Sequence, residues 1–206
     1  FNSKDKSNPI YLIKRIFQRL PTNSLNRLFA DLCKLSEEDI AYSIQNEIAS
    51  KKSWMAQYWP TDDEFKERFR TVPIYSISSW KCRFVLETLE ENFKHPEKVV
   101  LGNLWIEHVM PETLDEKWKN CLGEDWEDIY STRVHTMGNL TLIAPSSNES
   151  IKNKPFLEKK REWYSKSNIS LTKEINEKWN AWTKTEIQER ANILAERAVK
   201  IWPRPI

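Results

Sequence analysis

Hydrophobic positions at helical spacing dominate both ends of the chain. Near the N-terminus, one apolar stripe behind Pro9 predicts a helix over residues 9–20. Near the C-terminus, Thr183 and Glu186 form a capping box ahead of a second apolar stripe, which predicts a helix to about residue 201. The first stripe comprises Ile10, Ile13, Ile16, Phe17 and Leu20, and the second Ile187, Ala191, Leu194, Ala198 and Ile201. The fold class predicted is mainly α.

Further helices are predicted in the first hundred residues. Asn23 or Ser24 can cap a helix that runs through Leu35, and Ser36 is a weak cap for another. Thr61 and Glu64 form a capping box, and Ser78 or Ser79 can cap a helix to about residue 93. No chemistry is predicted for residues 1–79.

The middle of the chain changes character. Residues 99–109 are β-branched and apolar without a helical stripe, and residues 139–144 follow Gly138 and stop at Pro145, so both predict short strands. A polar stretch that contains tryptophan joins them. Pro155 can begin a helix to about residue 165. The middle of the chain is therefore predicted to be a strand–loop–strand–helix insertion within a helical chain.

Composition excludes several classes of function. Three glycines in 206 residues are too few for a Walker loop or a dinucleotide fingerprint. Cys33, Cys82 and Cys121 form no C-x-x-C pair, so neither a zinc ribbon nor a disulfide framework is predicted, and free thiols favour a reducing cytoplasm. No apolar run reaches membrane-spanning length. Because the chain begins at Phe1, we expect it to be part of a longer protein.

Charge is unevenly distributed, although the formal net charge is only +2. Residues 133–166 hold seven Lys or Arg against three Glu, and residues 112–128 hold seven acidic residues against two Lys. This pattern is compatible with a phosphate-binding face beside an acidic loop, and equally with two solvated surfaces.

The insertion holds the residues that could carry chemistry. A histidine such as His108 suits general-base work because its ordinary pKa lies near neutrality. An asparagine such as Asn139 can hold one ring nitrogen in the required tautomer. A carboxylate with an amide, here Glu107 and Asn148, offers the hard oxygen ligands that suit Mg²⁺. Phosphodiester hydrolysis needs an activated water and relief of charge on the phosphate.

The stretches EHVMP, HTMGNLTLIAPSSN and IKNKPF resemble the HNH (His-Me finger) nuclease domain at the C-terminus of GmrSD-type modification-dependent restriction enzymes. The resemblance runs from about residue 80 to the end. It implies that His108 activates water, that Asn139 orients His108, and that Glu107 and Asn148 bind the metal. Two positions depart from the wider HNH pattern: Glu107 stands where aspartate is common, and Asn148 where histidine is common.

Each assignment has a structural alternative. His108 could be a hydrogen-bonded structural residue, Asn139 could serve a turn, and Asn148 could cap a helix. His135 could contact phosphate, support Asn139 or anchor the loop, and Asn153 is a further candidate for a phosphate contact or a supporting role. Five basic residues could contact a DNA backbone or form a solvated helix face: Lys152, Lys154, Lys159, Lys160 and Arg161.

The sequence therefore predicts a helical N-terminal region over 1–79 and a nuclease domain over 80–206, with an embedded ββα-metal motif at about 103–165. The predicted function is metal-dependent DNA endonuclease activity with Mg²⁺ or Mn²⁺. The resemblance further implies phage defence, in which a separate N-terminal NTPase domain recognises modified DNA. Double-strand cleavage by a nuclease with one site suggests a possible homodimer. The alternatives are a catalytically silent helical binding module, and an RNase or nickase with the same motif.

Overall fold

The computed structural model describes Phe17 and residues 60–93, 101–145 and 151–204. The chain divides into two units, residues 1–68 with 198–206 and residues 69–197. The helices predicted over 9–20, 23–35 and after Ser36 lie outside the described residues, except that Phe17 is helical and buried. In this first unit the ring of Phe17 packs edge-on against Phe65, with ring centroids 5.6 Å apart. The domain boundary after residue 79 stays a prediction.

Both predicted capping boxes are confirmed. Helix α5 (Asp62–Thr71) begins after Thr61, whose backbone N–H donates to Glu64 Oε2 at 2.8 Å while Glu64 N donates back to Thr61 Oγ1 at 3.2 Å. Helix α13 (Lys184–Ile201) begins after Thr183, whose N–H donates to Glu186 Oε2 at 2.7 Å. These reciprocal bonds satisfy backbone donors that a helix start leaves without partners. Both helices contribute residues to both units.

Two short antiparallel strands lie at the centre of the second unit. Strand β1 (Trp105–His108) pairs with β2 (Leu140–Ile143) in the register Trp105↔Ile143 to His108↔Leu140. The position of β2 confirms the strand predicted over 139–144. β1 is shorter than the strand predicted over 99–109, because Leu101–Asn103 form a 3₁₀ turn, η1. All four residues of β2 are buried, and Thr141 is the polar one among them.

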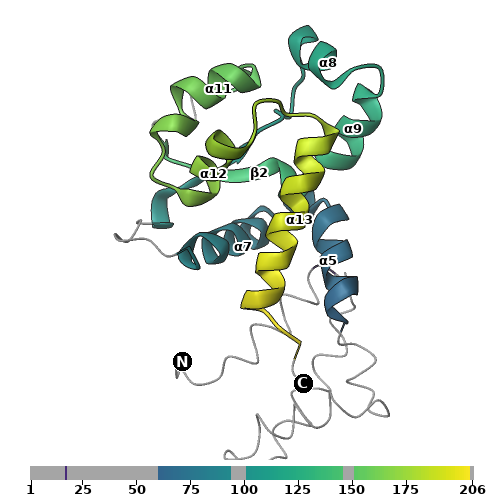
Figure 1. Ribbon diagram of the computed structural model, residues 1–206, viewed down its shortest axis with the longest axis vertical. Coiled ribbons are helices and arrows are strands. Elements are labelled where there is room, and N and C mark those ends of the chain that lie inside the picture. The colour runs from purple at the N-terminus through teal and green to yellow at the C-terminus, as the bar shows by residue number, and fades with distance from the viewer. Residues whose placement is uncertain (1–16, 18–59, 94–100, 146–150, 205–206) are drawn as a thin grey trace, which may run out of the picture. The chain divides into compact units, whose positions relative to one another are not determined.

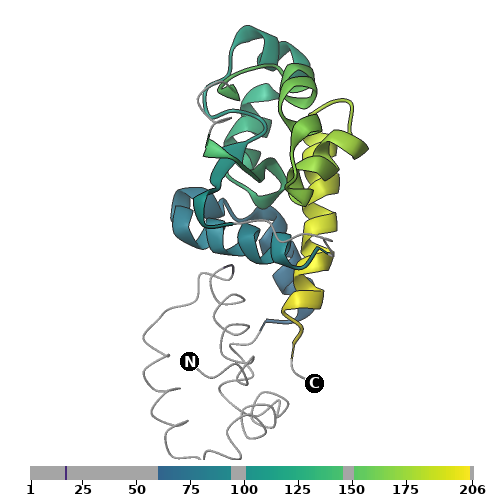
Figure 2. The same ribbon diagram turned by 90° about the vertical axis from the view of Figure 1, so that its left-hand side faces the viewer.

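Helices cover the strand pair from both sides (Figures 1 and 2). Helices α7 (Ser79–Glu91) and α12 (Ser170–Lys178) both contact β2, and α6 (Ile74–Ile77) precedes α7. Helix α11 (Phe156–Glu162) and the 3₁₀ turn η3 (Tyr164–Lys166) pack beside α12, so the helix predicted over 155–165 is confirmed with an earlier end. The buried carboxylate of Glu90 accepts from Ser170 N at 2.7 Å and from Leu171 N at 2.9 Å, which caps α12 from a neighbouring helix. The prediction of a mainly helical fold is therefore confirmed.

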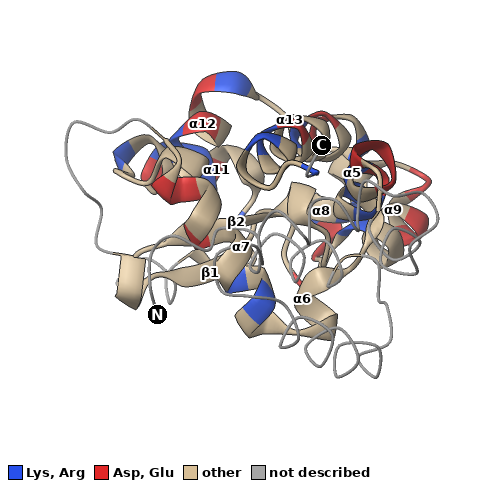
Figure 3. Cartoon of the chain, turned by 90° about the horizontal axis from the view of Figure 1, so that it is seen from below, with Lys and Arg blue, Asp and Glu red and all other residues tan. Residues whose placement is uncertain are grey.

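The connection between the strands is helical, where the sequence predicts only a polar stretch. It contains α8 (Glu116–Leu122), α9 (Trp126–Arg133) and the 3₁₀ turn η2 (Met137–Asn139). Asp115 caps α8 by accepting from Trp118 N at 2.9 Å, and Trp118 itself is buried. Acidic residues lie at the start of α9 and just before it (Figure 3), whereas α8 holds one Glu and two Lys. The acidic segment is thus an ordered helical pair with one buried face.

Helix α13 fixes the turn that leads into β2. A Cβ atom on Gly138 would lie 2.4 Å from the Ile187 carbonyl oxygen, so only glycine fits this close approach. The buried guanidinium of Arg190 donates from Nη1 to the carbonyl oxygens of Met137, Gly138 and Leu140, at 3.2, 2.9 and 2.7 Å. These contacts therefore hold the turn that contains Asn139 in a fixed position against α13. Across the described residues, no helix is both long enough and apolar enough to span a membrane.

Candidate histidine–glutamate site

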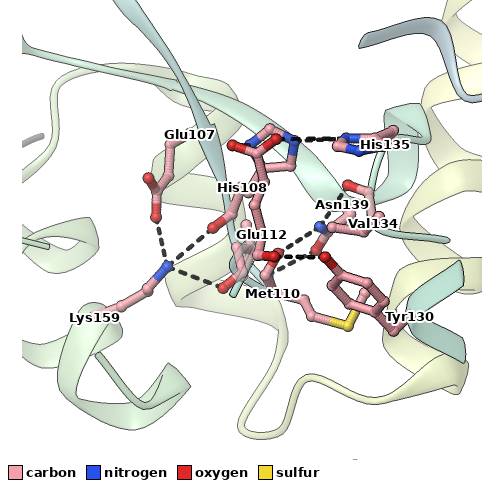
Figure 4. Close-up of polar contacts among 10 residues, drawn as sticks. Glu107, His108, Met110, Glu112, Tyr130, Val134, His135, Asn139 and Lys159 are labelled. Carbon is pink, nitrogen blue, oxygen red and sulfur yellow. Dashed lines mark hydrogen bonds and ion pairs between the residues drawn. The ribbon is translucent and has the colours of Figure 1, made fainter. Parts of the chain in front are cut away.

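His108 ends β1, and its ring contacts three side chains from separate parts of the second unit. Its Nε2 lies 3.2 Å from Nδ1 of His135, and its Nδ1 lies 3.9 Å from a carboxylate oxygen of Glu112 (Figure 4). The ring of Tyr75, from α6, stands perpendicular to it with centroids 4.5 Å apart. These contacts leave the His108 ring 7 % exposed at the wall of a cleft.

His135 and Glu112 come from the segment between the two strands. The His135 ring stacks on Tyr75 at 5.5 Å, and its backbone carbonyl accepts from Tyr75 N at 3.3 Å. The Glu112 backbone is anchored by the Tyr130 hydroxyl, which donates to the Glu112 carbonyl at 2.5 Å. The carboxylate of Glu112 lies 4.0 Å from His135 Nδ1 and is half exposed. These contacts thus hold His135 and Glu112 in place beside the His108 ring.

His108, Glu112 and His135 form a candidate metal site. One ligand atom from each lies within 4.8 Å of the other two. Two imidazoles and a carboxylate are a donor set that suits first-row transition ions better than Mg²⁺, which prefers oxygen ligands. The observed residues therefore fit a divalent metal, although not through the pair that the sequence analysis assigns.

The pKa of His108 is lowered to about 3, mainly by burial and also by the charges of the neighbouring His135 and Lys159. The ring is therefore neutral near pH 7 and carries one nitrogen with a free lone pair. When Nε2–H donates to His135, that lone pair is on Nδ1, on the side of Glu112. A neutral imidazole in this tautomer can accept a proton at a defined atom.

Glu107, predicted as a metal ligand, points away from the His108 ring (Figure 4). Adjacent residues of a strand face opposite sides of the sheet, so this divergence follows from their positions in β1. Glu107 Oε1 accepts from Lys159 Nζ at 2.7 Å and from the Tyr164 hydroxyl at 3.3 Å. Burial raises the pKa of Glu107 and lowers the pKa of Lys159, and the ion pair between them acts in the opposite direction on both groups.

Lys159 requires a correction, because it does not lie on the surface as a DNA contact would. Its side chain is fully buried, and Nζ donates to Glu107 Oε1, to the His108 carbonyl at 2.9 Å and to the Val109 carbonyl at 3.1 Å. All three ammonium protons are thus used within the protein. Lys159 holds the end of β1, where His108 lies.

The other predicted DNA-contacting residues differ in exposure. Lys160 donates to the Trp179 carbonyl and to Asn180 Oδ1, both at 2.7 Å, and so fastens α11 to the segment after α12. Lys154 pairs with Glu158 at 2.8 Å, and the exposed Arg161 pairs with Glu162 at 2.7 Å. Lys152 and Asn153 are exposed and line the His108 cleft. Of these, Lys152 is the cation best placed to meet a phosphate in the cleft.

Asn139 is buried and holds the loop that follows β1, without contact to the His108 ring. Its Oδ1 accepts from Met110 N at 2.8 Å and from Trp182 Nε1 at 3.0 Å. Its Nδ2 donates to the carbonyl oxygens of Met110 at 2.8 Å and Val134 at 2.9 Å. These four bonds use the amide fully, and the group that touches the His108 ring nitrogen is His135. Asn148 lies outside the described residues.

The cleft in front of His108 has a volume of about 490 Å³. Its walls come from α6, β1, the loop after β1 and the segment just before α11, through Tyr75, Trp105, Ile106, Glu107, His108, Pro111, Glu112, Thr113, Lys152 and Asn153. Neither Tyr75 nor Glu112 was predicted from the sequence. Glu112 could have been found, since it follows His108 by four residues just after Pro111, whereas Tyr75 reaches the site only through tertiary packing.

Comparison with known proteins identifies the family. A family model described as GmrSD restriction endonucleases, C-terminal domain, matches residues 59–197, well over half of the chain. No curated protein matches the chain significantly. The matched range contains the strands, the His108 cleft and most of α13. The chain therefore belongs to the family of C-terminal domains of GmrSD restriction endonucleases.

Proposed function

We propose that this chain is a DNA endonuclease in which neutral His108 is the general base for phosphodiester hydrolysis. The family implies nuclease activity in general. The observation that carries the finer proposal is the His108 ring itself, which is neutral, lies at the cleft wall and has Nε2 beside His135 Nδ1. We assign β1, β2 and the helical segment through α11 to an HNH-type ββα motif.

In the proposed reaction, a water in the cleft gives a proton to Nδ1 of His108 and attacks the phosphorus. The bond from phosphorus to the leaving 3′ oxygen breaks, and that oxygen takes up a proton from solvent. The Nε2–H bond to His135 fixes the tautomer that leaves Nδ1 able to accept. The Glu112 carboxylate, 3.9 Å from Nδ1, stabilises the imidazolium that forms. A bound phosphodiester is itself anionic and raises the pKa of His108 towards the range where a general base is efficient.

Glu112 and His135 are the described residues that would hold a divalent ion next to His108. A transition ion such as Mn²⁺ fits this donor set better than Mg²⁺ does. Such an ion supplies charge relief to the phosphate and to the leaving oxygen. Asn148 stays a proposed ligand, and Glu107 could serve as one only after release from Lys159.

We also propose the wider role that the family name suggests, restriction of foreign DNA as a phage defence. In this role the chain acts as the cutting part, and a separate NTPase recognises modified DNA. Exposed Lys152 beside the cleft supplies a sequence-independent phosphate contact, in keeping with recognition that resides elsewhere. Two copies would act together to cut both strands.

Cleavage of supercoiled plasmid tests the metal-dependent nuclease directly. We expect the 206-residue chain to nick plasmid with Mn²⁺ faster than with Mg²⁺, because one of the two residues proposed to hold the ion, His135, offers an imidazole. Excess EDTA should abolish nicking, and Mn²⁺ added beyond the EDTA should restore it. Nicking at the same rate in EDTA would contradict the role of a metal, and no nicking with any divalent ion would contradict the nuclease proposal for this chain.

A further inference from the structure

A second hollow adjoins the His108 cleft and shares part of its wall. It has a volume of about 340 Å³ and is lined by Tyr75, Ser79, Trp80, Arg83, Trp105 and Ile106. Tyr75, Trp105 and Ile106 also line the His108 cleft. The two hollows are therefore neighbours that share a wall formed by α6 and β1.

Two indole side chains stand exposed at this hollow. Trp80 is 64 % exposed and Trp105 is 52 % exposed, whereas the other tryptophans in the described ranges 60–93, 101–145 and 151–204 are buried or partly buried. Leaving a large apolar ring in water forgoes the stabilisation that its burial would give. Exposed rings on two different elements, α7 and β1, at one hollow thus indicate a surface for a ligand with flat apolar faces.

Positive charge accompanies the two rings. Helix α7 carries Lys81, whose Nζ lies 5.6 Å from the centroid of the Trp80 ring, and Arg83, which lines the hollow. Arg83 is held in place by Glu87 at 2.7 Å and by the Gly102 carbonyl at 3.0 Å. Aromatic rings next to cations are the combination with which proteins bind unpaired nucleotides, through base stacking and phosphate contacts.

Trp105 and His108 both line the cleft, although strand alternation turns their side chains to opposite faces of β1. Three residues of extended strand, about 10 Å, separate them along β1. This separation is roughly the rise of three stacked nucleotides in one DNA strand. A base that reaches Trp105 therefore belongs to a nucleotide close to the phosphate at His108.

We propose that this hollow is a stacking subsite for unpaired bases of the strand that His108 cuts, with Trp105 and Trp80 as the platforms. The proposal rests on the nuclease function proposed above and adds the substrate class, DNA that is single-stranded or locally unpaired beside the scissile phosphate. A base within an intact duplex has both faces covered by its neighbours and offers none to an indole. Cutting should therefore favour unpaired over fully paired DNA.

Binding of a single-stranded oligonucleotide that contains the fluorescent base 2-aminopurine tests the subsite, since stacking on an indole quenches this base. The measurement is made in EDTA, so that no cleavage occurs. We expect quenching with the wild-type chain. Trp105→Ala and Trp80→Ala should each remove part of the quenching and weaken binding about 5- to 100-fold. Trp105→Phe should retain most of both, because a phenyl ring still stacks.

Leu157→Ala is the matched control, because Leu157 is also a large exposed apolar side chain, 61 % exposed, and lines neither hollow. It should leave affinity and quenching unchanged. Equal affinity and equal quenching for wild type, Trp105→Ala and Trp80→Ala would overturn the subsite. If the quenching depends on the tryptophans but the chain cuts no DNA under any condition, the nuclease proposal is contradicted and the stacking subsite is not.

Discussion

Replacing His108 with alanine is expected to slow DNA cleavage by about 10²- to 10⁴-fold under single-turnover conditions, the usual effect of losing a general base. The size of the effect follows from the site, because no other described side chain takes the place of the His108 ring at the centre of the cleft wall. His135 borders the same ring, but its Nδ1 is engaged with His108. The rate of plasmid nicking at saturating metal measures the change.

Two controls separate a lost base from a damaged fold. His108→Gln keeps a polar side chain of similar reach and should be as slow as His108→Ala, because an amide does not take up a proton near pH 7. Imidazole added to the buffer should restore part of the cleavage activity of His108→Ala, because it can replace the missing base. It should not restore activity that is lost because the fold is damaged. Cleavage by both variants within about threefold of wild type would mean that the water is activated by another group.

Lys159→Met is expected to give the largest loss of stability, about 3–5 kcal/mol, because it leaves the Glu107 carboxylate buried without its partner. The change also removes the two bonds from Nζ to the His108 and Val109 carbonyls. Urea unfolding followed by circular dichroism measures the loss. Cleavage should fall as well, since the end of β1 that presents His108 is no longer held.

The double variant Lys159→Met with Glu107→Leu removes both charges and should recover most of the lost stability, as replacement of a buried ion pair by apolar residues commonly does. Arg161→Met, two residues further along α11, is the control for loss of an exposed cation and should barely change the urea midpoint. If Lys159→Met unfolds at the same urea concentration as wild type, the buried pair does not hold the site together.

Local signals in the sequence predict much of this fold. The capping boxes at Thr61 and Thr183 depend on residues three apart, so they can be read without tertiary information. The start of β1 is less well predicted. Residues 101–103 form a turn before the strand, but the residues around them are apolar, so the sequence does not show where the strand begins. Helices α8 and α9 were not predicted, since their polar faces hide the single buried ring of Trp118 and the buried Ile129.

The site is predictable in part. The resemblance to the family motif predicts a role for His108, but the partners of a side chain depend on where distant segments meet. Tyr75 is 33 residues before His108 and His135 is 27 residues after it, and their contacts arise only when α6 and the segment after α9 pack on β1. Strand alternation could have shown that Glu107 and His108 face opposite ways. Nothing local indicates that Lys159 is buried, since its neighbours Lys160 and Arg161 are charged as well.

The histidine ring signals in an NMR spectrum test the central claim most directly, because the chain contains only three histidines, His95, His108 and His135. A titration with paramagnetic Mn²⁺ broadens the ring signals of residues next to the bound ion. We predict that the signals of His108 and His135 broaden together at low metal concentration. Sharp signals from both His108 and His135, at a Mn²⁺ concentration that supports DNA cutting, would contradict a metal-assisted reaction at this pair.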